Sequence, residues 1–213
     1  MSEVVRVLIV DDHAMIAQMF LRLLDKEPDI EVVAAVGTGE EALREVRRGP
    51  VSVVVMDYDL PDTNGADLAR EVHAVRPDAS ILMVTASTDE RTLTRALEAG
   101  CAGFITKGRD FEELLTAVRT VARGESVVDP SVLKALLPQV RRSPDAPHVT
   151  LSNREREVLD LMAEGKSSRA ISEALIISHH TARNHVRHVL AKLGAHTQLE
   201  AVAVAARLGL LDR

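Results

Sequence analysis

Side chains that could carry phosphoryl-transfer chemistry follow four short apolar runs of the sequence. The first run is followed by Asp11 and Asp12, and later runs lead to Asp57, Thr85 and Lys107. Three clustered carboxylates repel one another unless a cation joins them, and hard oxygen ligands with open positions suit Mg2+. Asp57 could then attack a phosphoryl donor to give an aspartyl phosphate, with Lys107 and Thr85 stabilising the phosphoryl oxygens. These residue types therefore predict a Mg2+-dependent phosphoryl-acceptor site.

These residues can meet if the apolar runs are parallel strands of one sheet. The first 123 residues alternate between runs of strand length and amphipathic stretches, and a continuous run such as Val53–Met56 suits a strand buried on both faces. Five strands, each followed by a helix, predict an α/β fold with a five-stranded parallel sheet covered on both faces. Ligands of such sheets bind beyond the carboxyl ends of the strands. The second strand, which ends in no reactive residue, is expected at an edge.

The predicted strands of this domain are Arg6–Val10, Glu31–Val36, Ser52–Met56, Ser80–Val84 and Gly103–Ile105. The predicted helices cover residues 13–25, 39–48, 65–75, 89–99 and 110–123. The three segments of the chain are then a first domain over residues 1–123, a linker over 124–148 with a short helix near 130–138, and a smaller all-helical domain over 149–213.

The smaller domain has the pattern of four helices. Ser152 and Glu155 fit a capping box at the start of the first, and Ser178 can cap the third and longest helix. The predicted helices cover residues 152–164, 168–175, 179–193 and 197–208. The last of them could form a dimer surface or simply pack within the domain.

The helix predicted for 179–193 has one apolar and one basic face. Aliphatic residues recur at i, i+3, i+4 and i+7, namely Val186, Val189, Leu190 and Leu193. The opposite face has no acidic residue and carries His180, Arg183, Asn184, Arg187 and His188. A short helix, a tight turn and a longer basic helix predict a helix-turn-helix whose second helix enters the major groove of DNA.

Charge is unevenly distributed along the chain. The 213 residues carry a net charge of −6, but residues 1–130 hold 14 Lys and Arg against 24 Asp and Glu, whereas residues 149–213 hold 9 against 7. This asymmetry assigns any nucleic-acid contact to the C-terminal part. A single cysteine excludes an intramolecular disulfide. No stretch resembles a signal peptide or a membrane span, so we expect no membrane partner and a cytoplasmic location.

The segments around the predicted site resemble the receiver domains of response regulators, over about residues 5–123. The similar segments are Val7-Leu8-Ile9-Val10-Asp11-Asp12-His13, Met56-Asp57-Tyr58-Asp59-Leu60-Pro61, Thr85-Ala86 and Gly103-Phe104-Ile105-Thr106-Lys107. The resemblance implies a flavodoxin-like (βα)5 fold and phosphorylation of Asp57 by a sensor histidine kinase. It implies that Thr85 and Phe104 form a switch pair beside Lys107. It also implies a Mg2+ site made by Asp11, Asp12, Asp57 and the main-chain carbonyl of Asp59.

The C-terminal domain resembles the LuxR/FixJ-type helix-turn-helix. The similar positions are Leu151–Leu159, Gly165, Ile171, Leu175, Ile177-Ser178, Thr181, His185 and Lys192-Leu193-Gly194. A receiver joined to this domain is the layout of the NarL/FixJ class of transcription regulators. The resemblance implies that Arg183, Asn184 and Arg187 face double-stranded promoter DNA, with His180 on the same face, and that Lys192 contacts a phosphate.

The same resemblance implies a homodimer in the active state, with RNA polymerase as a candidate partner. One departure from the family pattern concerns the packing of the C-terminal helices. Ala170 stands where Glu is usual, which would remove an interaction between helices.

Two alternative functions stay open at this point. The stretch Asp57-Tyr58-Asp59 also satisfies the Asp-x-Asp pattern of haloacid-dehalogenase-type phosphatases. Those enzymes place their further acidic pair downstream, whereas Asp11 and Asp12 precede the pattern here. The second alternative is an atypical regulator that is not controlled by phosphorylation, and the complete set of acidic, hydroxyl and lysine residues argues against it. We do not expect an enzyme, beyond the receiver's own phosphorylation and dephosphorylation.

Overall fold

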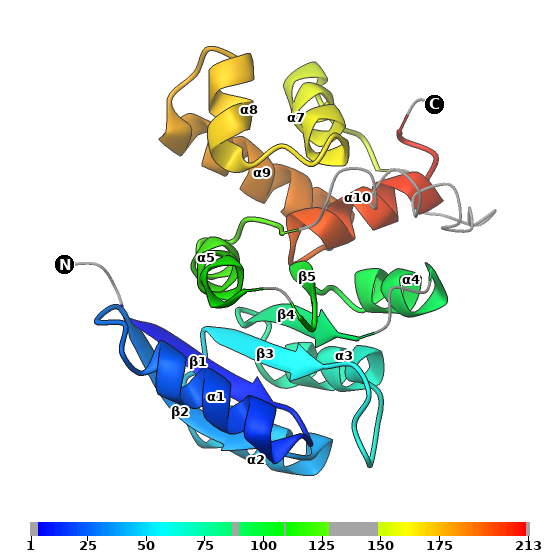
Figure 1. Cartoon of the computed structure of the whole chain (residues 1–213). Coiled ribbons are helices and arrows are strands. Elements are labelled where there is room, and N and C mark those ends of the chain that lie inside the picture. Colours follow the sequence, from blue (N-terminus) through cyan, green and yellow to red (C-terminus); the bar gives the residue numbers. More distant parts are fainter. Residues whose placement is uncertain (1–3, 87–89, 109, 128–148, 212–213) are drawn as a thin grey trace. The chain divides into compact units, whose positions relative to one another are not determined.

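The computed structural model describes residues 4–86, 90–108, 110–127 and 149–211 (Figure 1). The chain divides into two compact units, Met1–Val127 and Val128–Arg213. The short helix predicted near 130–138 and most of the predicted linker lie outside the described residues. Among the helices that are described, none combines the length and the apolar character needed to cross a membrane.

The N-terminal unit contains a five-stranded parallel sheet in the order β2-β1-β3-β4-β5. Its strands are β1 (Val5–Val10), β2 (Ile30–Val36), β3 (Val53–Asp57), β4 (Ser80–Thr85) and β5 (Gly103–Thr106). Its described helices are α1 (Ala14–Leu24), α2 (Gly39–Arg48), α3 (Gly65–Val75), α4 (Glu90–Glu98) and α5 (Phe111–Ala122). The predicted α/β fold is confirmed, and β2 lies at an edge as expected.

Side chains alternate between the two faces of the sheet along each strand, and helices cover both faces. Leu8, Met56 and Ile81 belong to a core that includes buried residues of α2, α3 and α4. Val7 and Val55 belong to a second core that includes buried residues of α1 and α5. This two-sided burial is the reason why the strands are continuous apolar runs rather than alternating ones.

The chain returns to the sheet after α5, which the sequence pattern did not indicate. The main chain of Val127 pairs with β5, since Phe104 N donates to Val127 O over 2.9 Å and Val127 N donates to Ala102 O over 3.0 Å. A Cβ atom on Gly103 would lie 2.8 Å from Val127 O and 2.9 Å from Val127 Cβ. Glycine at position 103 therefore permits this close approach at the edge of β5.

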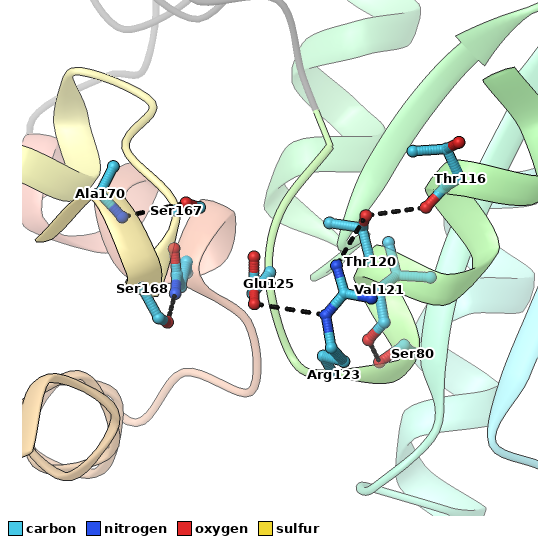
Figure 2. A network of polar contacts seen from close by, with 10 residues as sticks. Ser80, Thr116, Thr120, Val121, Arg123, Glu125, Ser167, Ser168 and Ala170 are labelled. Carbon is cyan, nitrogen blue, oxygen red and sulfur yellow. Dashed lines mark hydrogen bonds and ion pairs between the residues drawn. The ribbon is translucent and has the colours of Figure 1, made fainter. Parts of the chain in front are cut away.

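Polar contacts fix the end of α5 and the turn that follows it (Figure 2). Ser80 Oγ donates to Val121 O over 2.8 Å, which ties the start of β4 to α5. Arg123 reaches Thr120 Oγ1 over 3.2 Å and Glu125, which is 9% exposed, over 3.5 Å. These contacts hold the turn that directs residues 125–127 back to β5.

The regular secondary structure among the described residues of the C-terminal unit is entirely α-helical. Its helices are α7 (Asn153–Ala163), α8 (Ser168–Ala174), α9 (His179–Leu193) and α10 (Gln198–Arg207), as the sequence predicted. The capping box is confirmed: Ser152 N donates to Glu155 Oε2 over 2.7 Å and Glu155 N donates to Ser152 Oγ over 3.3 Å. Ser178 caps α9 through Thr181 N. Ser167 caps α8 through Ala170 N (Figure 2).

A buried hydrogen bond connects α8 and α10 close to the departure at Ala170. Gln198 Nε2 donates to Ser168 Oγ over 3.0 Å, and both residues are at most 3% exposed. A neutral pair therefore connects the two helices, although the usual glutamate is missing.

Candidate functional site

The carboxyl ends of β1, β3 and β5 bring Asp11, Asp57 and Lys107 into contact. Lys107 Nζ lies 2.6 Å from Asp57 Oδ2 and 2.9 Å from Asp11 Oδ2. The lysine follows β5, at the far side of the sheet from β1 in strand order, so only the folded sheet brings these groups together. One ammonium group thus bridges two carboxylates at the end of the sheet where ligands of parallel α/β folds bind.

Burial tunes the ionisation of this group. Asp11 and Asp57 are each 4% exposed. Burial raises the pKa of Asp57, and the hydrogen bond from Lys107 opposes this only in part. Burial alone would lower the pKa of Lys107, but its hydrogen bonds to Asp57 and Asp11 outweigh that effect and raise it. The folded N-terminal unit therefore holds a carboxylate that is poorly solvated and would gain from additional positive charge.

Four side chains form a group that could hold a metal ion. Ligand atoms of Asp11, Asp12, His13 and Asp57 all lie within 4.8 Å of one another. His13 Nδ1 lies 2.7 Å from Asp12 Oδ1, and its main-chain N–H donates to Asp11 Oδ1 over 2.9 Å. Three carboxylates are the oxygen donors that Mg2+ prefers, whereas an imidazole is not a usual ligand for it. The chemistry of the donor set therefore fits Mg2+ bound by the carboxylates.

This group differs at two residues, His13 and Asp59, from the metal site that the sequence predicted. His13 follows the acidic pair directly, and that adjacency was the available signal for its membership of the group. The side chain of Asp59 is exposed and does not belong to the group. The ligand expected from Asp59 was its main-chain carbonyl, and this expectation stays a prediction.

The loop between β3 and α3 is fixed to α2 by Asp62. Its carboxylate accepts hydrogen bonds from Gly39 N over 2.9 Å and from Glu40 N over 3.0 Å, at the first turn of α2. These bonds, the one from Gly39 first, hold the pKa of Asp62 below its usual value. At the other end of the loop, Gly65 N donates to Tyr58 O over 2.6 Å. Main-chain contacts therefore position the loop that follows Asp57.

Thr85 and Phe104 lie on the same face of the sheet. Thr85 is two residues after Met83 in β4, and Met83 is the register partner of Phe104 in β5. Thr85 is 1% exposed, whereas Phe104 is partly buried against the core that contains Met83. Lys107 N donates to Thr85 O over 2.8 Å, so the two strand ends are also joined by their main chains.

The outer surface of α9 in the C-terminal unit is polar and without acidic residues. Ala182, Val186, Val189 and Leu193 of this helix are buried. His180, Arg183 and Arg187 are exposed, and Asn184 is partly exposed with its Nδ2 3.3 Å from His180 Nδ1. This surface has the donors and positive charge that contact DNA phosphates and base edges.

Comparison with protein families assigns both units. Residues 7–119 match the response regulator receiver domain, and residues 149–205 match the luxR family of bacterial regulatory proteins. The chain belongs to the response regulators of two-component systems. Its layout is that of the NarL/FixJ class, a receiver joined to a LuxR-type DNA-binding domain, and it is a transcription regulator rather than an enzyme.

Curated relatives match this response regulator over nearly its whole length. The transcriptional regulatory protein DegU of Brevibacillus brevis is 32% identical, over 96% of this chain and 94% of the relative. The DNA-binding transcriptional activator DevR/DosR of Mycobacterium tuberculosis is also 32% identical, over 96% and 95%. The oxygen regulatory protein NreC of Staphylococcus carnosus is 34% identical, over 97% and 99%.

Solved structures give the same assignment. A LuxR-family two-component response regulator from Aurantimonas is 29% identical with a TM-score of 0.59, covering 64% of this chain and 98% of that one. The response regulator ChrA of a heme-sensing two-component system is 29% identical with a TM-score of 0.50, over 99% and 100%. Response regulators work with histidine kinases and DNA. Because both domains match families of these regulators, the phosphatase alternative is not supported.

Lys192 of the response regulator lies in an ion pair within its own domain. Its Nζ is 2.6 Å from Glu155 Oε2 and 3.3 Å from Thr150 O. Glu155 is only 6% exposed and is the same residue that closes the capping box of α7. The hydrogen bonds from Lys192 and from Ser152 N lower the pKa of Glu155 to about 2. Lys192 therefore connects α9 to the start of α7, in addition to any contact with DNA phosphate.

We expect Glu155→Gln to destabilise the C-terminal domain at neutral pH, with an effect that disappears in acid. A carboxyl whose pKa falls from 4.5 to about 2 stabilises the fold above pH 4.5 and loses this effect as the pH falls toward 2. We expect a loss of about 1–2 kcal/mol at pH 7, below the ~3 kcal/mol that the full shift would give, because solvent screens Lys192. Calorimetric unfolding between pH 2 and pH 7 measures it. The control is Glu157→Gln, whose side chain is 52% exposed, and equal stability of the Glu155→Gln and wild-type proteins at pH 7 would contradict the expectation.

Proposed function

We propose that Asp57 accepts a phosphoryl group from a sensor histidine kinase, and that this controls dimerisation and binding of promoter DNA by the C-terminal domain. The observation that supports the proposal most directly is the contact of Lys107 Nζ with Asp57 at 2.6 Å and Asp11 at 2.9 Å. A lysine in this place can stabilise the negative charge on the oxygens of a phosphoryl group at Asp57.

The residues around Asp57 have separate roles in the proposed phosphoryl transfer. Asp11, Asp12, Asp57 and the main-chain carbonyl of Asp59 would hold Mg2+, which supplies positive charge against the phosphoryl oxygens. A carboxylate oxygen of Asp57 forms the new bond to phosphorus, while the bond from phosphorus to the donor nitrogen breaks. Lys107 then pairs with a phosphoryl oxygen instead of the Asp57 carboxylate.

Thr85 and Phe104 give a route from this site to the end of the receiver. A hydroxyl of Thr85 that turns toward the phosphoryl group leaves space on the face that it shares with Phe104. The main-chain N–H of Phe104 donates to Val127 O, so a shift of β5 at this position would also move Val127, the last described residue of the receiver. We propose that this pairing carries the phosphorylation signal toward the segment that precedes the DNA-binding domain.

On the DNA side, the proposal assigns the contacts to α9. His180, Arg183, Asn184 and Arg187 would face the duplex, and Lys192 would add a phosphate contact from the C-terminal end of the helix. The active protein would be a homodimer, with RNA polymerase as a candidate partner at the promoter. A regulator that binds promoter DNA works beside the chromosome, so the proposed location is the cytoplasm.

The test combines mass and DNA affinity in one preparation. The protein is incubated with a small phosphodonor and Mg2+, its intact mass is measured, and its affinity for a duplex selected in vitro is compared before and after. We expect one phosphoryl group per chain and DNA binding that is at least about tenfold tighter. A near-complete switch between two states needs about 5.5 kcal/mol of differential stabilisation, and a tenfold change in affinity corresponds to a partial switch. Phosphorylation without a change in affinity or oligomeric state would contradict the proposed control. No phosphoryl adduct would favour a regulator that works without phosphorylation.

A further inference from the structure

The turn between α8 and α9 holds an isoleucine in an unusual conformation. Ile176 has a φ of 54°, and it is the one non-glycine residue with positive φ among those that the structure describes. A β-branched side chain is disfavoured in this left-handed region, where glycine or asparagine is normally found. The Ile176 side chain is nevertheless 93% exposed, so packing within the domain does not account for it.

The surrounding contacts impose this conformation on Ile176. Ile177 N donates to Ser172 O over 3.0 Å, which closes the C-terminal turn of α8. Arg154 Nη2, from α7, donates to Leu175 O over 2.9 Å and anchors the residue just before the turn. The turn is therefore fixed from both sides, and its exposed residue is presented in a defined place.

The place of Ile176 indicates what it contacts. It lies two residues before Ser178, the N-cap of α9, and the N-terminal end of a recognition helix is the part that approaches base edges. Among the large hydrophobic residues of 149–211 it alone is exposed, and one side chain is far smaller than the apolar patches that mark protein-binding surfaces. DNA presents isolated apolar groups of matching size, the C5-methyl of thymine in the major groove and the carbons of deoxyribose.

We propose that Ile176 is an apolar DNA contact that extends the reading surface of α9. This inference rests on the proposed function, because it requires α9 to be the helix that enters the groove. The isoleucine side chain would pack against a thymine methyl or a deoxyribose at the edge of the half-site, beyond the polar contacts of Arg183 and Asn184. A sequence preference for thymine at that position follows if the methyl group is the contact.

The variant Ile176→Gly separates this role from a structural one. Glycine adopts positive φ without strain, so the variant should raise the melting temperature of the C-terminal domain. The same variant should weaken DNA binding by the phosphorylated full-length protein about fivefold, the cost of losing a few buried methyl groups. Ile176→Val keeps a β-branched apolar side chain and should retain most of the affinity. A domain that is stabilised by Ile176→Gly and binds DNA as well as wild type would overturn the proposal.

Two further arms identify the contact and separate this inference from the proposed function. Replacing each thymine of the selected duplex by deoxyuridine removes one methyl group at a time. A thymine contact predicts one position at which wild type loses affinity and Ile176→Gly does not, whereas a deoxyribose contact predicts none. Arg183→Ala is measured beside them. If Arg183→Ala weakens DNA binding and Ile176→Gly does not, the proposed DNA contact of Ile176 is wrong. If neither variant weakens DNA binding, the assignment of α9 as the DNA-contacting helix fails.

Discussion

Asp57→Asn is expected to abolish phosphoryl incorporation and, at the same time, to make the unphosphorylated receiver more stable at neutral pH. The carboxamide has no anionic oxygen to form the acyl phosphate, so incorporation falls below detection. The gain in stability has a separate cause, since burial raises the pKa of Asp57 despite its bond with Lys107. An asparagine oxygen still accepts from Lys107 without a buried charge of its own.

The sign of the pH dependence follows from that raised pKa. A carboxyl that ionises less readily in the folded state than in the unfolded state destabilises the fold when both states are ionised. This penalty is fully present above the raised pKa and vanishes below the unfolded value of about 4. We expect Asp57→Asn to be more stable than wild type by on the order of 1 kcal/mol at pH 7, and equal to it near pH 3.

Divalent cations should reverse this difference. Mg2+ binds the native acidic group and stabilises wild type by mass action, and the variant has lost one of the three carboxylates. Intact mass measures incorporation, and urea unfolding with EDTA or with Mg2+ measures stability. The control is Asp78→Asn, an exposed position that should change neither quantity. An Asp57→Asn protein that still takes up phosphate, or that is less stable than wild type in EDTA at pH 7, would contradict the assignment.

Arg183→Ala and Arg187→Ala are each expected to weaken DNA binding by about tenfold to a hundredfold. Both side chains are exposed on α9 and form no ion pair with an acidic residue among the described residues, so they are available to DNA. A residue that contacts phosphate lowers the slope of log affinity against log salt by about 1 when removed, whereas one that reads a base lowers sequence preference instead. Affinity measured across a salt series, on the selected duplex and on a scrambled one, therefore assigns each arginine to one role.

Two other basic residues complete this experiment. Arg156→Ala removes the same charge from α7, and this control variant should leave both the DNA affinity and the salt slope nearly unchanged. Arg156 Nη1 donates to Leu210 O, beyond the end of α10. Lys192→Ala should lose affinity together with stability, because it leaves the buried Glu155 carboxylate without its ion pair. Equal losses for Arg156→Ala and Arg183→Ala would show a general charge effect and not a reading surface.

The sequence by itself determined the elements and the chemistry of the site. Runs such as Val53–Met56 require burial on both faces, and the helices start at residues with capping side chains such as Ser152 and Ser178. These are short-range effects, set by side-chain periodicity and by hydrogen bonds across three residues, so they are visible along the chain. The placement of reactive residues at strand ends follows from the parallel topology that the alternation predicts.

The tertiary structure alone decided which of these groups touch and which additional residues join them. Lys107 bridges Asp57 and Asp11, Asp62 binds the start of α2, and Val127 returns to the edge of β5. Lys192, which the sequence assigned to DNA, pairs with Glu155 at a separation of 37 residues. Such contacts join residues that are distant in sequence. Their distances and burial depend on how helices and strands pack, and no periodic pattern along the chain encodes them.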